Sequence, residues 1–227
     1  MAIALKVACA VAVLGVLFRM LVYWRAPQPQ TVVLTPAPAN AAGVMVRIAL
    51  EALIFRSLWR ADKLGWLLGI TFHYSLAVVV LRHHWLFFES SFSWLHVFDR
   101  AQFAPHALAA SLLALLIRRI WSARLRYISS LSDYLWPALL LAIAASGMLM
   151  WSVGSHDVLA VRSFSLRVWA LSSLPMPAHP VLAAHIGCVV LVLCLFPFSK
   201  MLHAPGILMS PTRTSPDRVR RREEAGS

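Results

Sequence analysis

Charged residues are scarce in this sequence. Asp, Glu, Lys and Arg make up 13% of its 227 residues, apolar residues make up 60%, and the mean hydropathy is +0.72. A soluble domain typically has about 25% charged and 45–50% apolar residues, so an ordinary water-soluble globule is excluded. Because one bilayer crossing needs about 20 apolar residues, the length allows four to six membrane helices. It leaves no room for an additional soluble catalytic domain.

Cysteine is also rare, and this restricts the redox chemistry. The three thiols are Cys9, Cys188 and Cys194, and all lie within apolar runs. The sequence has no Cys-x-x-Cys pair and no Cys-x-x-Cys-His motif, which excludes the common signatures of iron-sulfur clusters and of covalently attached haem. Any redox centre in this chain must therefore be bound non-covalently, through ligands other than thiolates.

Apolar segments long enough to cross a membrane are present instead. They predict an all-α polytopic membrane protein with five transmembrane helices in a bundle. The predicted spans cover roughly residues 2–24, 64–88, 103–121, 134–151 and 180–201.

The predicted organisation has four parts. Prolines in the segment 26–42 predict an extended loop, and the mixture of charged and apolar residues in 44–63 predicts an amphipathic helix at the membrane interface. Arg19 and the Tyr23–Arg25 flank favour an uncleaved first span over a signal peptide. The predicted parts are a first transmembrane helix (1–25), a cytoplasmic loop with the interfacial helix (26–63), a four-helix membrane core (64–203) and a basic cytoplasmic tail (204–227).

Basic residues are distributed unevenly between the two sides of these spans. With the N-terminus outside, 16 of the 21 Lys and Arg residues fall on the inner side. The positive-inside rule therefore places the N-terminus outside and the C-terminus in the cytoplasm. This asymmetry also explains the net charge of +12, so no nucleic acid partner is expected.

Histidine is the ionisable residue that stands out within the spans. Ionisable groups in a membrane are costly and often functional. His96, His156 and His179 fall in predicted outer loops, where a solvated side chain is the simpler interpretation. The nine histidines are His73, His83, His84, His96, His106, His156, His179, His185 and His203.

Two spans carry histidines at paired depths. On a continuous helix, His185 and His203 are five whole turns apart, so they face one direction about 27 Å apart, whereas His73 and His83 are about 15 Å apart. The second and fifth spans run antiparallel. His73 and His203 therefore share the inner side, and His83 and His185 share the outer side, as two stacked bis-histidine haems require.

The outer ligand on the second span stays open between His83 and His84. On a helical wheel, His84 lies only about 20° from the face of His73, whereas His83 lies about 80° away. Geometry alone therefore favours His84 as the outer ligand of the second span.

The histidine spacing resembles that of a known family. Phe72-His73, His83, His185 and the Phe196–Lys200 segment before His203 resemble the gamma subunit of respiratory nitrate reductases, a five-span dihaem cytochrome b. The stretch 198–213, with the segments 132–134 and 158–162, looks closer to the Dsr-type branch, which is linked to dissimilatory sulfite reductase. The resemblance covers most of residues 50–213. The proline-rich insert near residue 30 and the Ala-Pro-Gly after His203 depart from the nitrate reductase pattern.

The resemblance implies two b-type haems, held by His83 with His185 on the outer side and by His73 with His203 on the inner side. It implies a bacterial inner-membrane subunit of a quinol or quinone oxidoreductase complex in respiratory sulfur metabolism. Menaquinone or ubiquinone would be its membrane substrate. A cytoplasmic iron-sulfur subunit similar to heterodisulfide reductase would exchange electrons with it, and a periplasmic multihaem cytochrome c and other membrane subunits are further expected partners.

A quinone site needs a polar group that hydrogen-bonds the ring oxygen, and His84, Arg100 and His106 are the outer-side candidates. The direction of electron flow and the terminal reaction, which would take place on partner subunits, stay open. One alternative is the gamma subunit of a nitrate reductase itself. Another is a haem-free transporter lined by histidines, although the centres of the second to fifth spans contain no Asp or Glu.

Overall fold

The computed structural model describes residues 1–27, 37–38, 40–89, 93–153, 157–170, 175–210 and 214–217. Most of the predicted proline-rich loop, His156 and the Arg-rich end of the predicted tail lie outside these residues. Within them every regular element is a helix, which confirms the all-α class. The chain forms two compact units, one made of residues 1–11 and 67–195 and the other of residues 12–66 and 196–227.

Long apolar helices account for most of the predicted spans. Among the described residues, four helices are long and apolar enough to cross a membrane. A fifth crossing is counted if η2 (Ser93–Arg100) and α5 (Ala104–Trp121), which are bent by 61°, form one broken span. The structure thus supports four or five spans. The four are α1 (Ala2–Arg25), α4 (Lys63–Arg82) continued by η1 (His84–Leu86), α7 (Ser132–Val153), and α9 (Pro180–Leu195) continued by η3 (Phe196–Phe198).

These helices expose most of their apolar surface. Between 6% and 17% of the residues in each apolar window are buried inside the protein. In water such large apolar surfaces would drive association, but in a bilayer lipid or other membrane subunits cover them. The protein is therefore a polytopic membrane protein.

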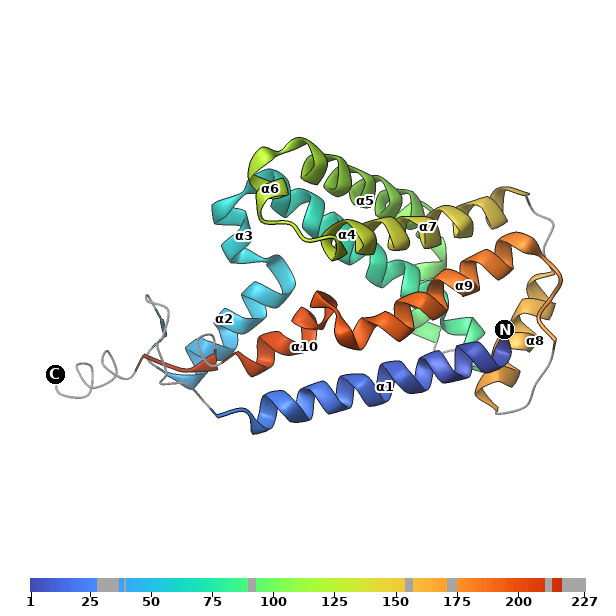
Figure 1. The fold of residues 1–227 in the computed structure, drawn as a ribbon, viewed down its shortest axis with the longest axis horizontal. Coiled ribbons are helices and arrows are strands. Elements are labelled where there is room, and N and C mark those ends of the chain that lie inside the picture. Colours follow the sequence, from blue (N-terminus) through green and yellow to red (C-terminus); the bar gives the residue numbers. More distant parts are fainter. Residues whose placement is uncertain are drawn as a thin grey trace. The chain divides into compact units, whose positions relative to one another are not determined.

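In the first unit, α7 packs between α5 and α9 (Figure 1). One buried cluster is formed by Phe72 of α4, Leu108 and Leu112 of α5, and Ala144 of α7. The second cluster joins α9 to α8 (Val158–Trp169), a helix that the sequence analysis did not predict. At 12 residues, α8 is too short to register as a span, and the side chain of Asp157 caps its first turn.

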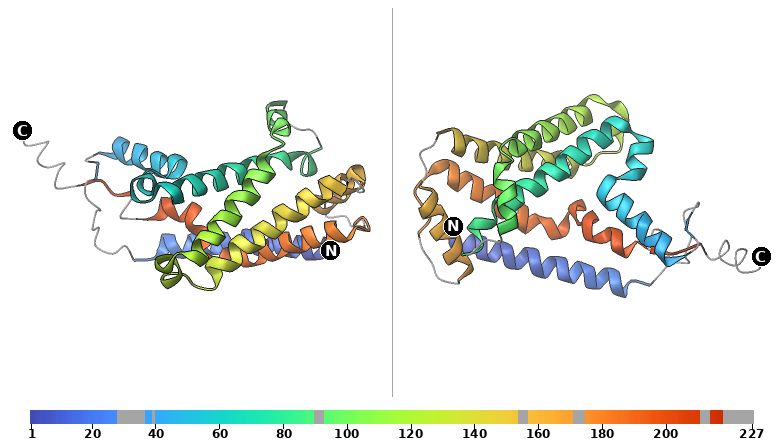
Figure 2. Two further views of the ribbon diagram at one scale, coloured as in Figure 1. Left: turned by 90° about the horizontal axis from the view of Figure 1, so that it is seen from above. Right: turned by 180° about the vertical axis from the view of Figure 1, so that it is seen from behind.

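In the second unit, the predicted interfacial helix is broken in two (Figure 2, pale blue). α2 (Ala41–Ile54) ends and α3 (Arg56–Ala61) begins at Phe55, whose φ of 50° and ψ of 47° are left-handed. Residues 44–63 are therefore helical on both sides of Phe55, and the prediction of a single continuous helix is wrong. The remaining helical elements of the chain are α6 (Ala123–Tyr127), η4 (Lys200–Leu202), α10 (His203–Gly206) and η5 (Ile207–Met209).

A close contact in the second unit gives a testable stability prediction. A Cβ added to Gly15 would lie 2.5 Å from Cβ and 2.6 Å from Cγ of Pro197, and the Pro197 carbonyl also accepts a hydrogen bond from Arg19 Nε. The rigid proline ring cannot rotate away. We expect Gly15→Ala to lower the stability of the detergent-solubilised protein by about 1–3 kcal/mol, measured by denaturant unfolding, whereas Gly187→Ala, whose Cβ would meet nothing within 4 Å, leaves this contact intact.

Candidate functional site

His185 is held against α7 by two hydrogen bonds. Its Nδ1 lies 3.1 Å from the carbonyl oxygen of Ile143 and 3.0 Å from Oγ of Ser146. The ring also packs on Gly147, where an added Cβ would lie 3.5 Å from Cε1 of His185. α7 therefore fixes the direction in which this imidazole of α9 points.

His83 lies near His185 in the first unit. The two side chains are close enough to interact electrostatically. His83 comes immediately after the last residue of α4, and the backbones of α4 and α9 do not pack closely against each other in the described chain. The pairing of these two imidazoles on one haem stays a prediction.

All four predicted haem ligands share one hydrogen-bond pattern. Nδ1 of His73 lies 2.7 Å from the Gly69 carbonyl oxygen, Nδ1 of His83 lies 2.7 Å from that of Val79, and Nδ1 of His203 lies 3.1 Å from that of Lys200. His185 bonds to a carbonyl in the same way. Because a carbonyl only accepts hydrogen bonds, Nδ1 must carry the proton. In this tautomer the lone pair is on Nε2, as in many metal-binding histidines.

The helical-wheel argument for His84 fails because α4 ends at Arg82. His83 has φ and ψ of −84° and 1°, and His84 begins a 3₁₀ turn. Neither side chain therefore follows the 100° step of the helix that carries His73.

The depth argument for the last span must also be corrected. α9 ends at Leu195, and 3₁₀ turns separate it from His203. Pro197, which cannot continue regular α-helical hydrogen bonding, lies in the first of these turns. His185 and His203 are thus not on one continuous helix, and the predicted separation of five whole turns does not hold.

The predicted inner pair is divided between the two units. His73 belongs to the first unit, where its ring contacts the ring of Phe72 edge-on with 4.6 Å between centroids. His203 begins α10 in the second unit and is exposed. The pairing of these two histidines stays a prediction.

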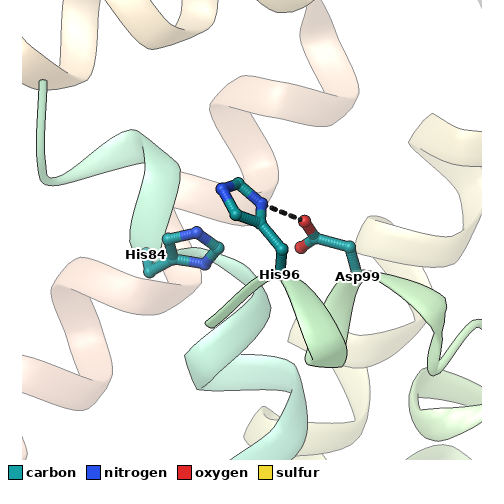
Figure 3. Close-up of side chains that lie close together, drawn as sticks. All are labelled: His84, His96 and Asp99. Carbon is teal, nitrogen blue, oxygen red and sulfur yellow. Dashed lines mark hydrogen bonds and ion pairs between the residues drawn. The ribbon is translucent and has the colours of Figure 1, made fainter. Parts of the chain in front are cut away.

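His84 belongs to a different cluster (Figure 3). It is only 4% exposed, and its Nδ1 lies 2.8 Å from the Leu81 carbonyl oxygen. Its ring lies edge-on to the ring of His96, with 5.5 Å between the ring centroids. Nδ1 of His96 lies 2.9 Å from Oδ2 of Asp99. One ligand atom from each of these three residues lies within 4.8 Å of the other two.

The other two predicted quinone-site residues are Arg100, which follows Asp99 in the sequence, and His106. Arg100 is the last residue of η2 and His106 is in the first turn of α5, and both are exposed. The ring of His106 is tilted against that of Phe103, with 6.5 Å between centroids. In the described chain His96 and Asp99 adjoin His84; His96 is exposed, as expected for a solvated side chain, and it also contacts these two residues.

Sequence reasoning missed four residues that shape these sites. Ser146 orients His185, and Arg162 of α8 donates hydrogen bonds to the carbonyls of Trp85 and Glu89 after α4. No local pattern indicated these long-range contacts. His96 and Asp99 did carry a signal, since their spacing of three residues places side chains on one side of a 3₁₀ helix.

The fold and its histidines together define a class: a polytopic helical membrane protein in which imidazoles from different helices adjoin. Similarity searches then specify its relatives. The chain is 32% identical over 204 residues to the "Hdr-like menaquinol oxidoreductase cytochrome b-like subunit" of Archaeoglobus fulgidus. The aligned region covers 78% of this chain and 61% of the relative. It is 28% identical over 261 residues to the subunit of the same name from Archaeoglobus profundus, covering 94% of this chain and 77% of the relative.

The chain is thus a homologue of Hdr-like menaquinol oxidoreductase cytochrome b-like subunits, at moderate identity. This confirms the resemblance indicated by the histidine spacing. The chain spans 61% of the length of the Archaeoglobus fulgidus relative. No protein-family model and no solved structure matches the chain.

Proposed function

We propose that the chain is the dihaem cytochrome b subunit of a quinol oxidoreductase complex. It would carry electrons from menaquinol in the membrane to a cytoplasmic iron-sulfur subunit similar to heterodisulfide reductase, in a sulfite reductase-associated respiratory complex. The observation that carries this proposal is that His83 and His185 lie in the same unit and each bonds a backbone carbonyl through Nδ1, which leaves Nε2 of both rings available as a ligand atom. The names of the two relatives support the link to menaquinol.

The side chains present fit a b-type haem. Such a haem needs one neutral imidazole nitrogen on each side of the porphyrin and apolar surroundings. The His83 and His185 tautomers supply two Nε2 lone pairs, and the apolar helices α4, α7 and α9 supply the surroundings. When bound in this way, the haem supplies reversible one-electron transfer at its iron.

The residues of the chain would set the orientation of this centre. The Ile143 carbonyl and Ser146 Oγ hold the His185 ring, and the Val79 carbonyl holds the His83 ring. These hydrogen bonds raise the basicity of the ligating nitrogens and fix their direction. His73 and His203 would hold the second haem nearer the cytoplasmic side, which would bring electrons to the face where the partner docks.

Quinol oxidation would take place on the outer side, near the His83 and His185 pair. His84, Arg100 and His106 remain the proposed quinone-site residues, since each is a polar group at that end of the second and third predicted spans. The N-terminus would be periplasmic and the C-terminus cytoplasmic, as the distribution of basic residues predicts.

An optical spectrum of the purified, detergent-solubilised protein tests this proposal. We expect reducible low-spin b-type bands and two haems per chain by extraction. A menaquinol analogue should reduce both haems. A colourless protein that takes up no added haem would eliminate the cytochrome and favour the haem-free alternative.

Gly147 provides a more local test of the outer site. The ring of His185 lies in ordinary van der Waals contact with the position of an added Cβ, so Gly147→Ala should retain both haems. Gly147→Leu adds branched carbons toward the ring and should displace it. We expect the Leu variant to lose most of one haem in the optical spectrum, and equal haem contents in the two variants would contradict this geometry.

A further inference from the structure

The buried ring of His84 has a polar atom that no neighbour satisfies. Its Nε2 is buried and has no hydrogen-bond partner among the described residues. Nδ1 bonds to the Leu81 carbonyl and must carry the proton, so Nε2 carries a lone pair. A buried acceptor without a partner is uncommon and indicates a group that binds there.

His96 and Asp99 lie beside this ring (Figure 3). They are three residues apart on the 3₁₀ helix η2, and side chains at this spacing eclipse each other. His96 Nδ1 and Asp99 Oδ2 are 2.9 Å apart, and the rings of His96 and His84 are in contact. Two imidazoles and one carboxylate therefore converge from two separate elements.

The separations of these donors suit a small metal ion. One donor atom from each residue lies within 4.8 Å of the other two. Ligands of tetrahedral Zn²⁺, at about 2.0–2.2 Å from the metal, lie about 3.4 Å from one another. The donors need to approach by at most about 1.4 Å, and His96 and Asp99 are exposed, so a change of side-chain rotamer can bring them toward the buried ring of His84.

We propose that His84, His96 and Asp99 form a binding site for Zn²⁺. Two neutral imidazole nitrogens and one carboxylate oxygen are typical zinc ligands, and three protein ligands leave a fourth position for water. Neither His84 nor His96 is a proposed haem ligand. The site is thus distinct from the two haem sites, and it shares His84 with the proposed quinone site.

The surrounding contacts hold the two halves of the site in place. Arg82 donates a hydrogen bond to the Ala101 carbonyl, which anchors the chain that follows η2 to the end of α4. Arg162 anchors the carbonyls of Trp85 and Glu89 on the other side of His84. A metal ion here would tie η2 to the end of α4, immediately next to His83.

Zinc binding by the intact, haem-containing protein tests the site. The protein is treated with chelator, equilibrated with Zn²⁺, and assayed by elemental analysis and by X-ray absorption at the zinc edge, where haem iron does not interfere. We expect one tightly bound Zn²⁺ per chain with nitrogen and oxygen ligands at about 2.0–2.2 Å. His96→Asn, at an exposed position, should weaken binding on the order of 100-fold and leave the haem content unchanged.

Matched variants separate the zinc site from other effects. His84→Gln should also lose zinc and retain both haems, whereas His106→Asn, an exposed histidine outside the cluster, should retain zinc. The proposal is overturned if the wild type binds no more Zn²⁺ than His96→Asn, or if His106→Asn loses zinc equally. It is also overturned if His84→Gln loses a haem, because His84 would then be an iron ligand.

Discussion

Replacing His185 by alanine is expected to remove one haem, lowering the haem content per chain by roughly half. Alanine has no group that can ligate iron, and the Ile143 carbonyl and Ser146 Oγ would lose the ring that they orient. The remaining haem should still give low-spin b-type bands with dithionite. Reduction by a menaquinol analogue should fall by at least about tenfold, since the outer centre is the proposed electron acceptor.

A double-variant comparison makes this prediction specific to the pair. If His83 and His185 hold the same haem, the His83→Ala and His185→Ala variants lose the same bands, and the double variant loses nothing more. His84→Ala serves as the control, because the ring of His84 contacts that of His96 and His84 is not a proposed haem ligand. Loss of the outer haem in His84→Ala, with retention in His83→Ala, would show that the pairing is wrong.

The sequence was sufficient to predict the helical class and most of the membrane spans. Spans are readable because every buried backbone group in lipid must bond within its own helix, which requires long apolar runs. The third span was the least clear in the structure, since α5 passes as a span only together with the bent η2. Hydropathy detects apolar length and gives no information about a 61° bend.

The errors in the site geometry have one physical cause. The wheel and depth arguments both treat a span as one continuous α-helix, but α4 ends at Arg82 and α9 ends at Leu195. His83, His84 and His203 all lie beyond these ends, where the rotation and rise per residue differ from those of an α-helix. His83 and His185 both lie in the first unit, and their pairing on one haem stays a prediction.

The contacts that orient the rings could not be read from the sequence. Ser146 and His185 are 39 residues apart, and Arg162 lies 73 residues from Glu89. Such pairs depend on how α7 and α8 pack, which no local periodicity encodes. By contrast, the bonds from His73 and His83 to the carbonyls four residues earlier are local, since each joins residues close together in the sequence.

Variants of His73 and His203 are expected to separate electron entry from electron exit. Each alanine substitution should remove the inner haem and leave the outer bands, because each imidazole supplies one of two axial nitrogens. A menaquinol analogue should still reduce the remaining haem. Electron delivery to the iron-sulfur partner in the reconstituted complex should fall by several orders of magnitude, since the route across the membrane is interrupted.

The same variants test whether His73 and His203 ligate a single haem. His203 is exposed at the start of α10, and His73 lies on α4 beside Phe72, so both substitutions should leave the fold of the first unit intact. His179→Ala, at a histidine just before α9, is the matched control and should retain both haems. If His73→Ala and His203→Ala remove different bands, the two histidines cannot ligate the same iron, and each must have another partner.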